Sequence, residues 1–280
     1  MTVPFDIREV RDIGMLAYNM RFGGDGRLWF STLCENAVMS LDLATFKVET
    51  HFANEAFCTY CFNGQRGAIG TMDGKVLTFS VDDPTLCLAA EADSASAIGP
   101  IELDYQSDSL FYGCRRAIYR TSLAGEPLGN WPCKLPCRAL CFSSEAVTLW
   151  SVCDGIELIN VVTGESTIKE QNRQCPYANI ALAPDETVAL AGGDINIFTS
   201  VGKALISISG DYNQVHFGSY GRLLAREVVK NYFADVTVST RVHAGLEYDV
   251  LSHCNSFAMD SSENVIVASH LGKLYFFARR

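Results

Sequence analysis

The chain has 280 residues, 48% of them hydrophobic, and a net charge of −10. Proteins that bind the phosphate backbone concentrate Lys and Arg, so this charge argues against nucleic acid as a direct partner. The N-terminal residues are charged and lack a continuous apolar run, and no uncharged stretch reaches the roughly 18 residues of a membrane span, so the sequence predicts a soluble protein without a secretory signal. Eleven scattered cysteines and no Asn-x-Ser/Thr acceptor favour reduced thiols in an intracellular, cytoplasmic compartment.

Residues 24–52 contain a module of short β-rich runs separated by turns. The turn Gly24-Asp25-Gly26 leads into the apolar run 28–30, and the polar pair Glu35-Asn36 leads into the alternating run 38–43. A third run follows at 47–52. Turns that punctuate short β-rich runs are typical of hairpins, so the module predicts a small antiparallel sheet.

The module recurs along the whole chain. The residues that should end the first strand of each copy are spaced by 34 to 43 positions: Phe22, Phe62, Tyr105, Phe142, Ala183, Phe217 and Met259. A period of roughly 40 to 45 with four strands per copy is typical of propeller blades, which stack around a central axis. The sequence therefore predicts an all-β fold, a single seven-bladed β-propeller over residues 1–280 with four-stranded antiparallel blades.

The last copy stops directly after its third strand, at Arg280. Residues 3–13 have the length and the alternating apolar side chains, Phe5, Ile7 and Val10, to supply the missing outer strand. An unpaired strand edge invites aggregation, so we expect the N-terminal strand to complete the seventh blade and close the ring.

The repeats resemble the WD40-like and NHL-like group of β-propellers. The copy at 182–208, LAPDETVALAGGDINIFTSVGKALISI, has the layout of a WD-type blade, and Leu41-Asp42 stands where that group has Trp-Asp. The Gly-His pair typical of the group is absent from every copy. The stretch GDGRLWFSTLCENAVMSLDLATFKVET also resembles one blade of the streptogramin B lyase type, a seven-bladed enzyme. The WD40-like resemblance implies a protein-interaction scaffold.

Two cysteine patterns have spacings that invite a metal interpretation. Cys58 and Cys61 form a C-x-x-C in a predicted strand, where positions i and i+3 point to opposite faces and cannot share an ion. In an extended segment Cys137 and Cys141 lie about 13 Å apart, whereas two zinc thiolates lie within about 4 Å. Unless the chain folds back at its prolines, Cys133, Cys137 and Cys141 cannot bind one ion. We expect neither a metal nor a cofactor.

A third pattern concerns position in the repeat. Six residues fall at or near the first strands of their blades, segments that converge on one mouth of a propeller channel: Cys58, Cys137, Cys175, His216, His253 and Cys254. They indicate either a metal or thiol site at the channel mouth or small residues that fill narrow positions. The absence of a ligand spacing favours the second interpretation.

The sequence contains no G-x-S-x-G elbow for a nucleophilic serine. A lyase or lactone-opening reaction needs a general base near the axis, and His216 with Asp104 or Glu102 is the one combination that the alignment places on inner strands. An ordinary solvated channel lining explains these residues equally well.

Basic residues gather on two predicted blades: Arg222, Arg226 and Lys230 on the sixth, and Arg115, Arg116 and Arg120 on the third. They are either a surface for an acidic protein partner or solubilising side chains. The sequence as a whole favours a non-enzymatic scaffold that binds other protein subunits in a larger complex. The alternatives are a propeller enzyme of lyase or hydrolase type and a small-ligand or peptide binder at the channel mouth.

Overall fold

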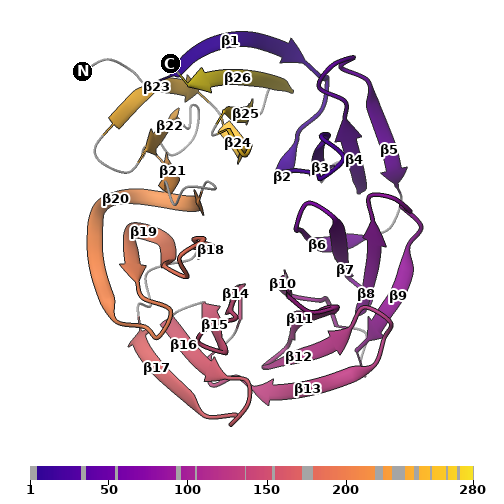
Figure 1. Cartoon of the computed structure of the whole chain (residues 1–280), viewed down its shortest axis with the longest axis vertical. Coiled ribbons are helices and arrows are strands. Elements are labelled where there is room, and N and C mark those ends of the chain that lie inside the picture. The colour runs from indigo at the N-terminus through magenta and orange to yellow at the C-terminus, as the bar shows by residue number, and fades with distance from the viewer. Residues whose placement is uncertain are drawn as a thin grey trace.

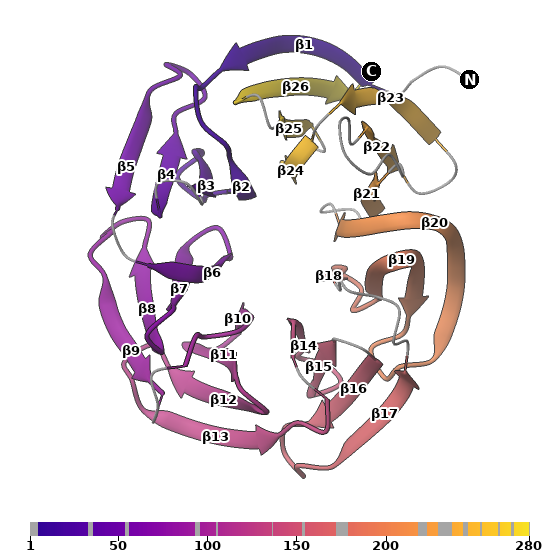
Figure 2. The same ribbon diagram turned by 180° about the vertical axis from the view of Figure 1, so that it is seen from behind.

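Antiparallel sheets form a ring around a central opening (Figures 1 and 2). The computed structural model describes residues 5–32, 36–53, 56–92, 96–104, 106–135, 137–152, 155–171, 179–217, 223–228, 237–242, 246–252, 254–262, 264–269 and 272–279. Among these residues no helix is long and apolar enough to cross a membrane. The sheets and their arrangement around the centre make the architecture an all-β propeller, as predicted.

Five of the sheets have four strands each. The first three contain β2 (Tyr18–Phe22), β3 (Leu28–Thr32), β4 (Ala37–Leu41) and β5 (Val48–Phe52); β6 (Phe57–Phe62), β7 (Arg66–Thr71), β8 (Lys75–Ser80) and β9 (Cys87–Glu91); and β10 (Ile101–Leu103), β11 (Ser109–Cys114), β12 (Ala117–Ser122) and β13 (Pro127–Pro132). The other two contain β14 (Ala139–Ser143), β15 (Thr148–Val152), β16 (Gly155–Asn160) and β17 (Ser166–Gln171); and β24 (Cys254–Met259), β25 (Val265–Ser269), β26 (Lys273–Arg279) and β1 (Phe5–Asp12).

The sixth sheet has six strands and corrects the predicted number of blades. It contains β18 (Asn179–Leu182), β19 (Val188–Phe198), β20 (Ala204–Phe217), β21 (Leu223–Val228), β22 (Thr237–Val242) and β23 (Leu246–Ser252). The prediction of seven separate blades is wrong, because the described strands form six sheets.

The strand β20 explains the difference. Its first part pairs with β19, with Ile208 opposite Ile195, and its last part pairs with β21, with Phe217 opposite Leu223. One continuous strand thus serves as the outer strand of one repeat and the inner strand of the next, and in Figure 1 it runs along the perimeter before it turns toward the centre. The corresponding repeat spacing, 34 residues from Ala183 to Phe217, is the shortest in the series and leaves little room for two separate strands.

The first strand of each four-stranded sheet in sequence order, or β24 in the last sheet, lies toward the central opening (Figure 1). Hydrophobic side chains pack between neighbouring sheets, as expected for blades that bury both faces. The indole of Trp29 in β3, for example, stacks on the rings of Phe62 and Phe79 in the next sheet, with centroid distances of 5.3 and 5.6 Å. These interfaces hold the inner strands in place and so position the side chains that line the centre.

The strand β1 pairs with β26 and brings both ends of the chain into one sheet. The antiparallel register runs from Phe5 opposite Arg279 to Asp12 opposite Lys273, with a β-bulge between Ile7 and Glu9. Just beyond the strand, the Ile13 amide donates a hydrogen bond of 2.8 Å to the Gly272 carbonyl. The N-terminal residues therefore occupy the outer position predicted for them, and their contribution to holding the ring closed stays a prediction.

Candidate functional site

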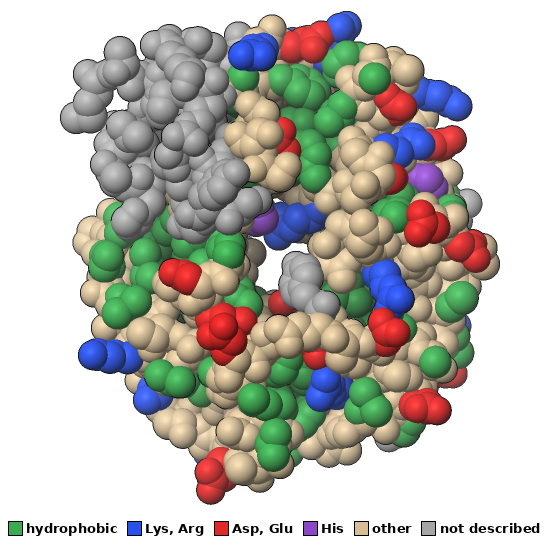
Figure 3. Space-filling model, in the orientation of Figure 1, with side chains coloured by type: hydrophobic (Ala, Val, Ile, Leu, Met, Phe, Trp, Pro, Cys, Tyr) green, Lys and Arg blue, Asp and Glu red, His purple; other side chains and the backbone are tan. Residues whose placement is uncertain are grey.

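Two neighbouring cavities of about 710 and 430 Å³ lie at the centre of the ring. The larger one, here called the strand-entrance cavity, is lined by the beginnings of inner strands; the smaller, the hairpin cavity, is lined by the turns that follow those strands. Both are lined by Arg21, Glu102, Leu140 and Ile180, which we call the waist of the channel. In the space-filling view the centre of the ring is open, with basic, acidic and histidine side chains at its edge (Figure 3).

A β-bulge precedes Arg21 at the waist. The register of β2 with β3 shifts between Tyr18 and Arg21, and Asn19 has a φ of 52°, in the left-handed region that non-glycine residues rarely adopt. Bulges of this kind often re-aim a side chain next to a functional site. The Arg21 Nη1 donates a hydrogen bond of 3.0 Å to the Met20 carbonyl. Among the described residues no carboxylate lies within ion-pair distance of its guanidinium.

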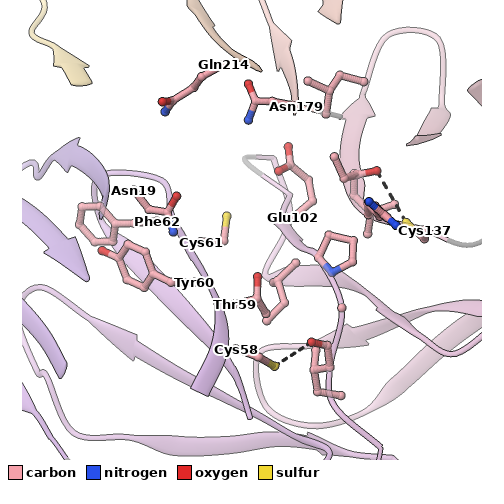
Figure 4. Close-up of a pocket in the computed structure, with 18 of the residues that line it drawn as sticks. Asn19, Cys58, Thr59, Tyr60, Cys61, Phe62, Glu102, Cys137, Asn179 and Gln214 are labelled. Carbon is pink, nitrogen blue, oxygen red and sulfur yellow. Dashed lines mark hydrogen bonds between the residues drawn. The ribbon is translucent and has the colours of Figure 1, made fainter. Parts of the chain in front are cut away.

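Glu102 comes from the short strand β10. Its neighbours Ile101 and Leu103 are buried in the hydrophobic cluster between sheets, so the alternation of the strand leaves Glu102 on the channel side (Figure 4). Burial raises the pKa of the Glu102 carboxyl to about 8, against the opposing effects of the Phe142 backbone N–H and the Arg21 guanidinium. At neutral pH this carboxyl group is therefore largely protonated and can donate a hydrogen bond.

His216 lies near the end of β20 and lines the hairpin cavity. Burial, with a smaller contribution from Arg21, lowers the pKa of the His216 imidazole to about 3. Its ring meets Phe257 edge-on, with centroids 6.4 Å apart. A neutral imidazole adds no charge to the channel and can accept a hydrogen bond from a bound molecule or donate one to it.

The two predicted carboxylate partners of His216 differ in their surroundings. His216, Glu102 and Asp104 all line the hairpin cavity. Asp104, however, accepts a hydrogen bond of 2.9 Å from Arg120 Nη2 and another of 2.7 Å from the Ser107 hydroxyl. Asp104 is paired with Arg120, whereas Glu102 has no hydrogen bond or ion pair with another described side chain.

The structure places the predicted cysteines Cys58 and Cys137 in the lining of the same strand-entrance cavity, and Cys61 lines another part of it (Figure 4). The Cys58 thiol lies 2.9 Å from the Ile98 carbonyl oxygen and the Cys137 thiol 3.6 Å from that of Ala139, so both act as protonated donors. Burial raises the pKa of the Cys61 thiol to about 12. In the described ranges no three His, Cys, Asp or Glu side chains are grouped to hold a metal ion.

Cys133 and Cys141, the other two members of the predicted triplet, are buried. Burial, assisted by Glu157, raises the pKa of the Cys133 thiol to about 11, and burial raises that of Cys141 well above its ordinary value. Of the other predicted channel-mouth residues, Cys175, His253 and the side chain of Cys254 lie outside the described part of the structure.

The predicted basic surface on the third blade divides into two parts. Arg115 and Arg116 are exposed in the turn between β11 and β12, where Arg115 Nε donates a hydrogen bond of 3.0 Å to the Ser96 hydroxyl. Arg120 instead pairs with the buried Asp104. Arg222, Lys230 and the side chain of Arg226 lie outside the described residues.

Sequence reasoning missed Arg21 and four amide side chains of the strand-entrance cavity: Asn19, Asn179, Asn213 and Gln214. Asn179 accepts a hydrogen bond of 2.9 Å from the Val215 amide through Oδ1, whereas the buried Oδ1 of Asn213 has no partner among the described residues. A usable signal existed, because Arg21, Cys61 and His216 each directly precede the residue that ends the first strand of a repeat. That position faces the channel in all three.

Comparisons with known proteins describe the fold. No protein-family model and no curated protein sequence matches the chain. A chain in a crystal structure of a mitotic checkpoint complex superposes with a TM-score of 0.75 at 12% identity, over 98% of this chain and 91% of that one. A streptogramin B lyase structure superposes with a TM-score of 0.78 at 13% identity, over 100% of both chains. At these identities the similarity shows the fold alone, and the chain is a β-propeller.

Proposed function

We propose that this propeller binds a small polar molecule in its central channel. The observation that carries the proposal is the convergence of Arg21, Glu102 and His216, from three different sheets, on a channel that holds two cavities. Polar groups with strongly shifted pKa values that meet in a cavity are typical of functional sites.

The polar groups around the channel are incompletely satisfied. Arg21 has no carboxylate at ion-pair distance in the described part of the chain, and the buried Oδ1 of Asn213 has no hydrogen-bond partner. Buried polar groups in folded proteins are otherwise almost always paired. The half-buried Arg21 side chain lines the cavity and can reach a molecule bound there. A cavity of about 710 Å³ is large enough for a small molecule that supplies these partners.

The proposal can be tested on protein purified from its native cell. Small molecules released by denaturation are identified by mass spectrometry, for the wild-type protein and for Ile180→Trp, which fills the waist. Val162→Trp is the matched control, because Val162 is 77% exposed and lies outside both cavities. We expect a molecule that is retained by the wild type and the control and lost from Ile180→Trp. Identical extracts from all three folded proteins would overturn the proposal.

A second candidate is the scaffold function that the sequence favours, in which the propeller binds other protein subunits. One observation supports it: the adjacent residues Leu205 and Ile206 in β20 are 51% and 49% exposed, and Val201 in the preceding turn is 64% exposed. Neighbouring residues of a strand point to opposite faces, so apolar surface faces outward on both sides of this strand. Affinity purification followed by mass spectrometry should then recover subunits that Ile206→Glu loses and Ile180→Trp keeps. Recovery of the same proteins with both variants would argue against this surface.

A further inference from the structure

We propose that the molecule bound in the channel is a small organic anion that also carries hydroxyl groups, with its acidic group held by Arg21 at the waist. This inference rests on the proposed channel-binding function and names the chemical class of the ligand. It assigns Arg21 as the anchor and the amide side chains of the strand-entrance cavity as the hydroxyl-binding groups.

The charge of the strand-entrance cavity favours an anion. The described residues that line it include three of the Arg, Lys, Asp or Glu types, namely Arg21, Arg138 and Glu102. The lining thus contains two arginines and one glutamate, although the chain as a whole carries a net charge of −10. A guanidinium presents five N–H donors in a planar fork that matches a carboxylate or a phosphate. Within the described part of the chain, the Arg21 guanidinium donates from Nη1 to the Met20 carbonyl and from no other nitrogen.

Glu102 does not cancel the charge of Arg21. No ion pair joins these two side chains, both of which are described, and burial raises the pKa of Glu102 to about 8. The groups that face Glu102 from neighbouring elements are Arg21 on β2, Cys61 on β6, Asp104 after β10 and Cys141 on β14. The two thiols have raised pKa values and Asp104 is paired with Arg120. Near pH 7 the waist therefore offers an O–H donor on Glu102 and, on Arg21, a cation without a carboxylate partner among the described residues.

The hairpin cavity is less suited to the acidic group. Its described lining includes Asp104 and Glu186. Glu186 accepts a hydrogen bond of 3.1 Å from the Ser144 hydroxyl through Oε1, and its buried Oε2 has no partner within the described ranges. Because Asp104 is paired with Arg120, the charge that an anion would meet there is that of Glu186. We therefore infer that the body of the ligand lies in the strand-entrance cavity.

The amide groups of that cavity suit hydroxyls. The amides of Asn19, Asn179, Asn213 and Gln214 come from β2, β18 and β20 (Figure 4 labels all except Asn213). Asn179 uses its Oδ1 on the Val215 amide, which leaves its Nδ2 as a donor, whereas the buried Oδ1 of Asn213 needs a donor from the ligand. A hydroxyl group can both donate and accept, so it satisfies each of these groups.

Isothermal titration calorimetry with three probes tests the inference. The probes are D-glucuronate, glucose 6-phosphate and methyl glucoside, which carry a carboxylate, a phosphate and no charge. We expect at least one of the two anions to bind at least tenfold more tightly than methyl glucoside. Arg21→Gln should lower the affinity for that anion at least tenfold without changing the affinity for methyl glucoside. Arg66→Gln is the matched control, because Arg66 pairs with Asp108 and lines neither channel cavity. Preference for one anion identifies the acidic group.

A pH series on the wild-type protein gives a second readout that does not depend on the folding of a variant. Affinity for the preferred anion should fall as the pH rises from 6.5 to 9.5, because Glu102 loses its proton near pH 8 and then repels the ligand. Glu102→Gln should bind the anion with little dependence on pH over the same range.

The possible failures separate the two proposals. Equal affinity for all three probes, with no effect of Arg21→Gln, would overturn the anion inference and leave channel binding in place. No binding of any probe would also overturn the present inference. The extraction experiment with Ile180→Trp decides independently whether the channel holds a ligand of another class.

Discussion

At the scale of single residues, a buried polar contact in the first sheet illustrates how side chains outside the channel stabilise the ring. Ser40 is 0% exposed, and its Oγ shares a hydrogen bond of 2.8 Å with His51 Nε2. The His51 ring stacks on Trp29 with a centroid distance of 4.4 Å, and the Trp29 Nε1 donates to Asp25. This network couples the outer strand of the sheet to the aromatic interface with the next sheet.

We predict that Ser40→Ala lowers the free energy of unfolding by about 1 to 2 kcal/mol, because it leaves the half-buried His51 nitrogen without its partner. Chemical denaturation followed by fluorescence measures the change. Ser207→Ala on the exposed face of β20 serves as the control and should be close to neutral. If the two variants unfold at the same denaturant concentration, the hydrogen bond contributes little.

Sequence reasoning reached part of the channel lining at this scale. It selected Cys58, Cys137, Glu102 and His216 from their positions in the repeat, and these residues do line the two cavities. It did not select Arg21, because a single arginine in a predicted strand matches no sequence motif for a binding or catalytic site. The significance of Arg21 arises from its surroundings, namely the bulge at Asn19 and the protonated state of Glu102 on another sheet. Neither the bulge nor the protonation state of Glu102 can be inferred from the spacing of residues in the sequence.

At the scale of strands, β1 offers a direct test of ring closure. It pairs with β26 along its whole length, and without it the backbone of β26 would present an unpaired edge. We predict that deletion of residues 1–12 lowers the melting temperature and broadens the thermal transition. Deletion of residues 1–4 alone, which precede β1, is the control and should leave the transition unchanged. An unchanged cooperative transition after the longer deletion would show that β1 is dispensable.

The continuous strand β20 gives a second prediction at this scale. A Cβ atom at Gly210 would overlap the ring of Tyr212, which is 1% exposed and packs in the core of the six-stranded sheet. We expect Gly210→Ala to destabilise the protein by about 1 to 3 kcal/mol, as overpacking usually does. Hydrogen exchange should rise in β19 to β21, and Ser209→Ala should change neither property. Equal protection from hydrogen exchange in both variants would mean that the Tyr212 ring moves aside for the added Cβ atom at little energetic cost.

The same strand shows where sequence reasoning about elements fails. The period of the repeats identified the inner strands well, since β2, β6, β20 and β24 end at the predicted residues Phe22, Phe62, Phe217 and Met259. The number of separate sheets was wrong, because the repeat period counts sequence copies and does not show whether the chain breaks between them. A strand can cross from one copy to the next when the connection is short, as it does at 204–217.

At the scale of the whole molecule, Glu102 and His216 make stability depend on pH in opposite directions. Folding raises the pKa of Glu102 from 4.5 to about 8, so its stabilising contribution is complete below pH 4.5 and is lost as the pH rises to 8. Folding lowers the pKa of His216 from 6.5 to about 3, so the unfolded chain binds the proton more readily, and stability is lost as the pH falls from 6.5 to 3. Within its pH window, each group changes the free energy of unfolding by at most about 1.4 kcal/mol per pH unit.

We therefore predict that the free energy of unfolding of the wild-type protein has a maximum near the middle of these two windows, at mildly acidic pH. Glu102→Gln should raise stability on the alkaline side, His216→Gln on the acidic side, and the double variant should have the flattest profile. Denaturation in urea between pH 4 and pH 9 measures all four proteins, with the exposed Glu126→Gln as the control. The residual slope on the acidic side should come from surface carboxylates such as Asp42 and Asp73, whose pKa values are lowered by hydrogen bonds. Parallel profiles for the wild type and the double variant would mean that water in the channel screens both groups.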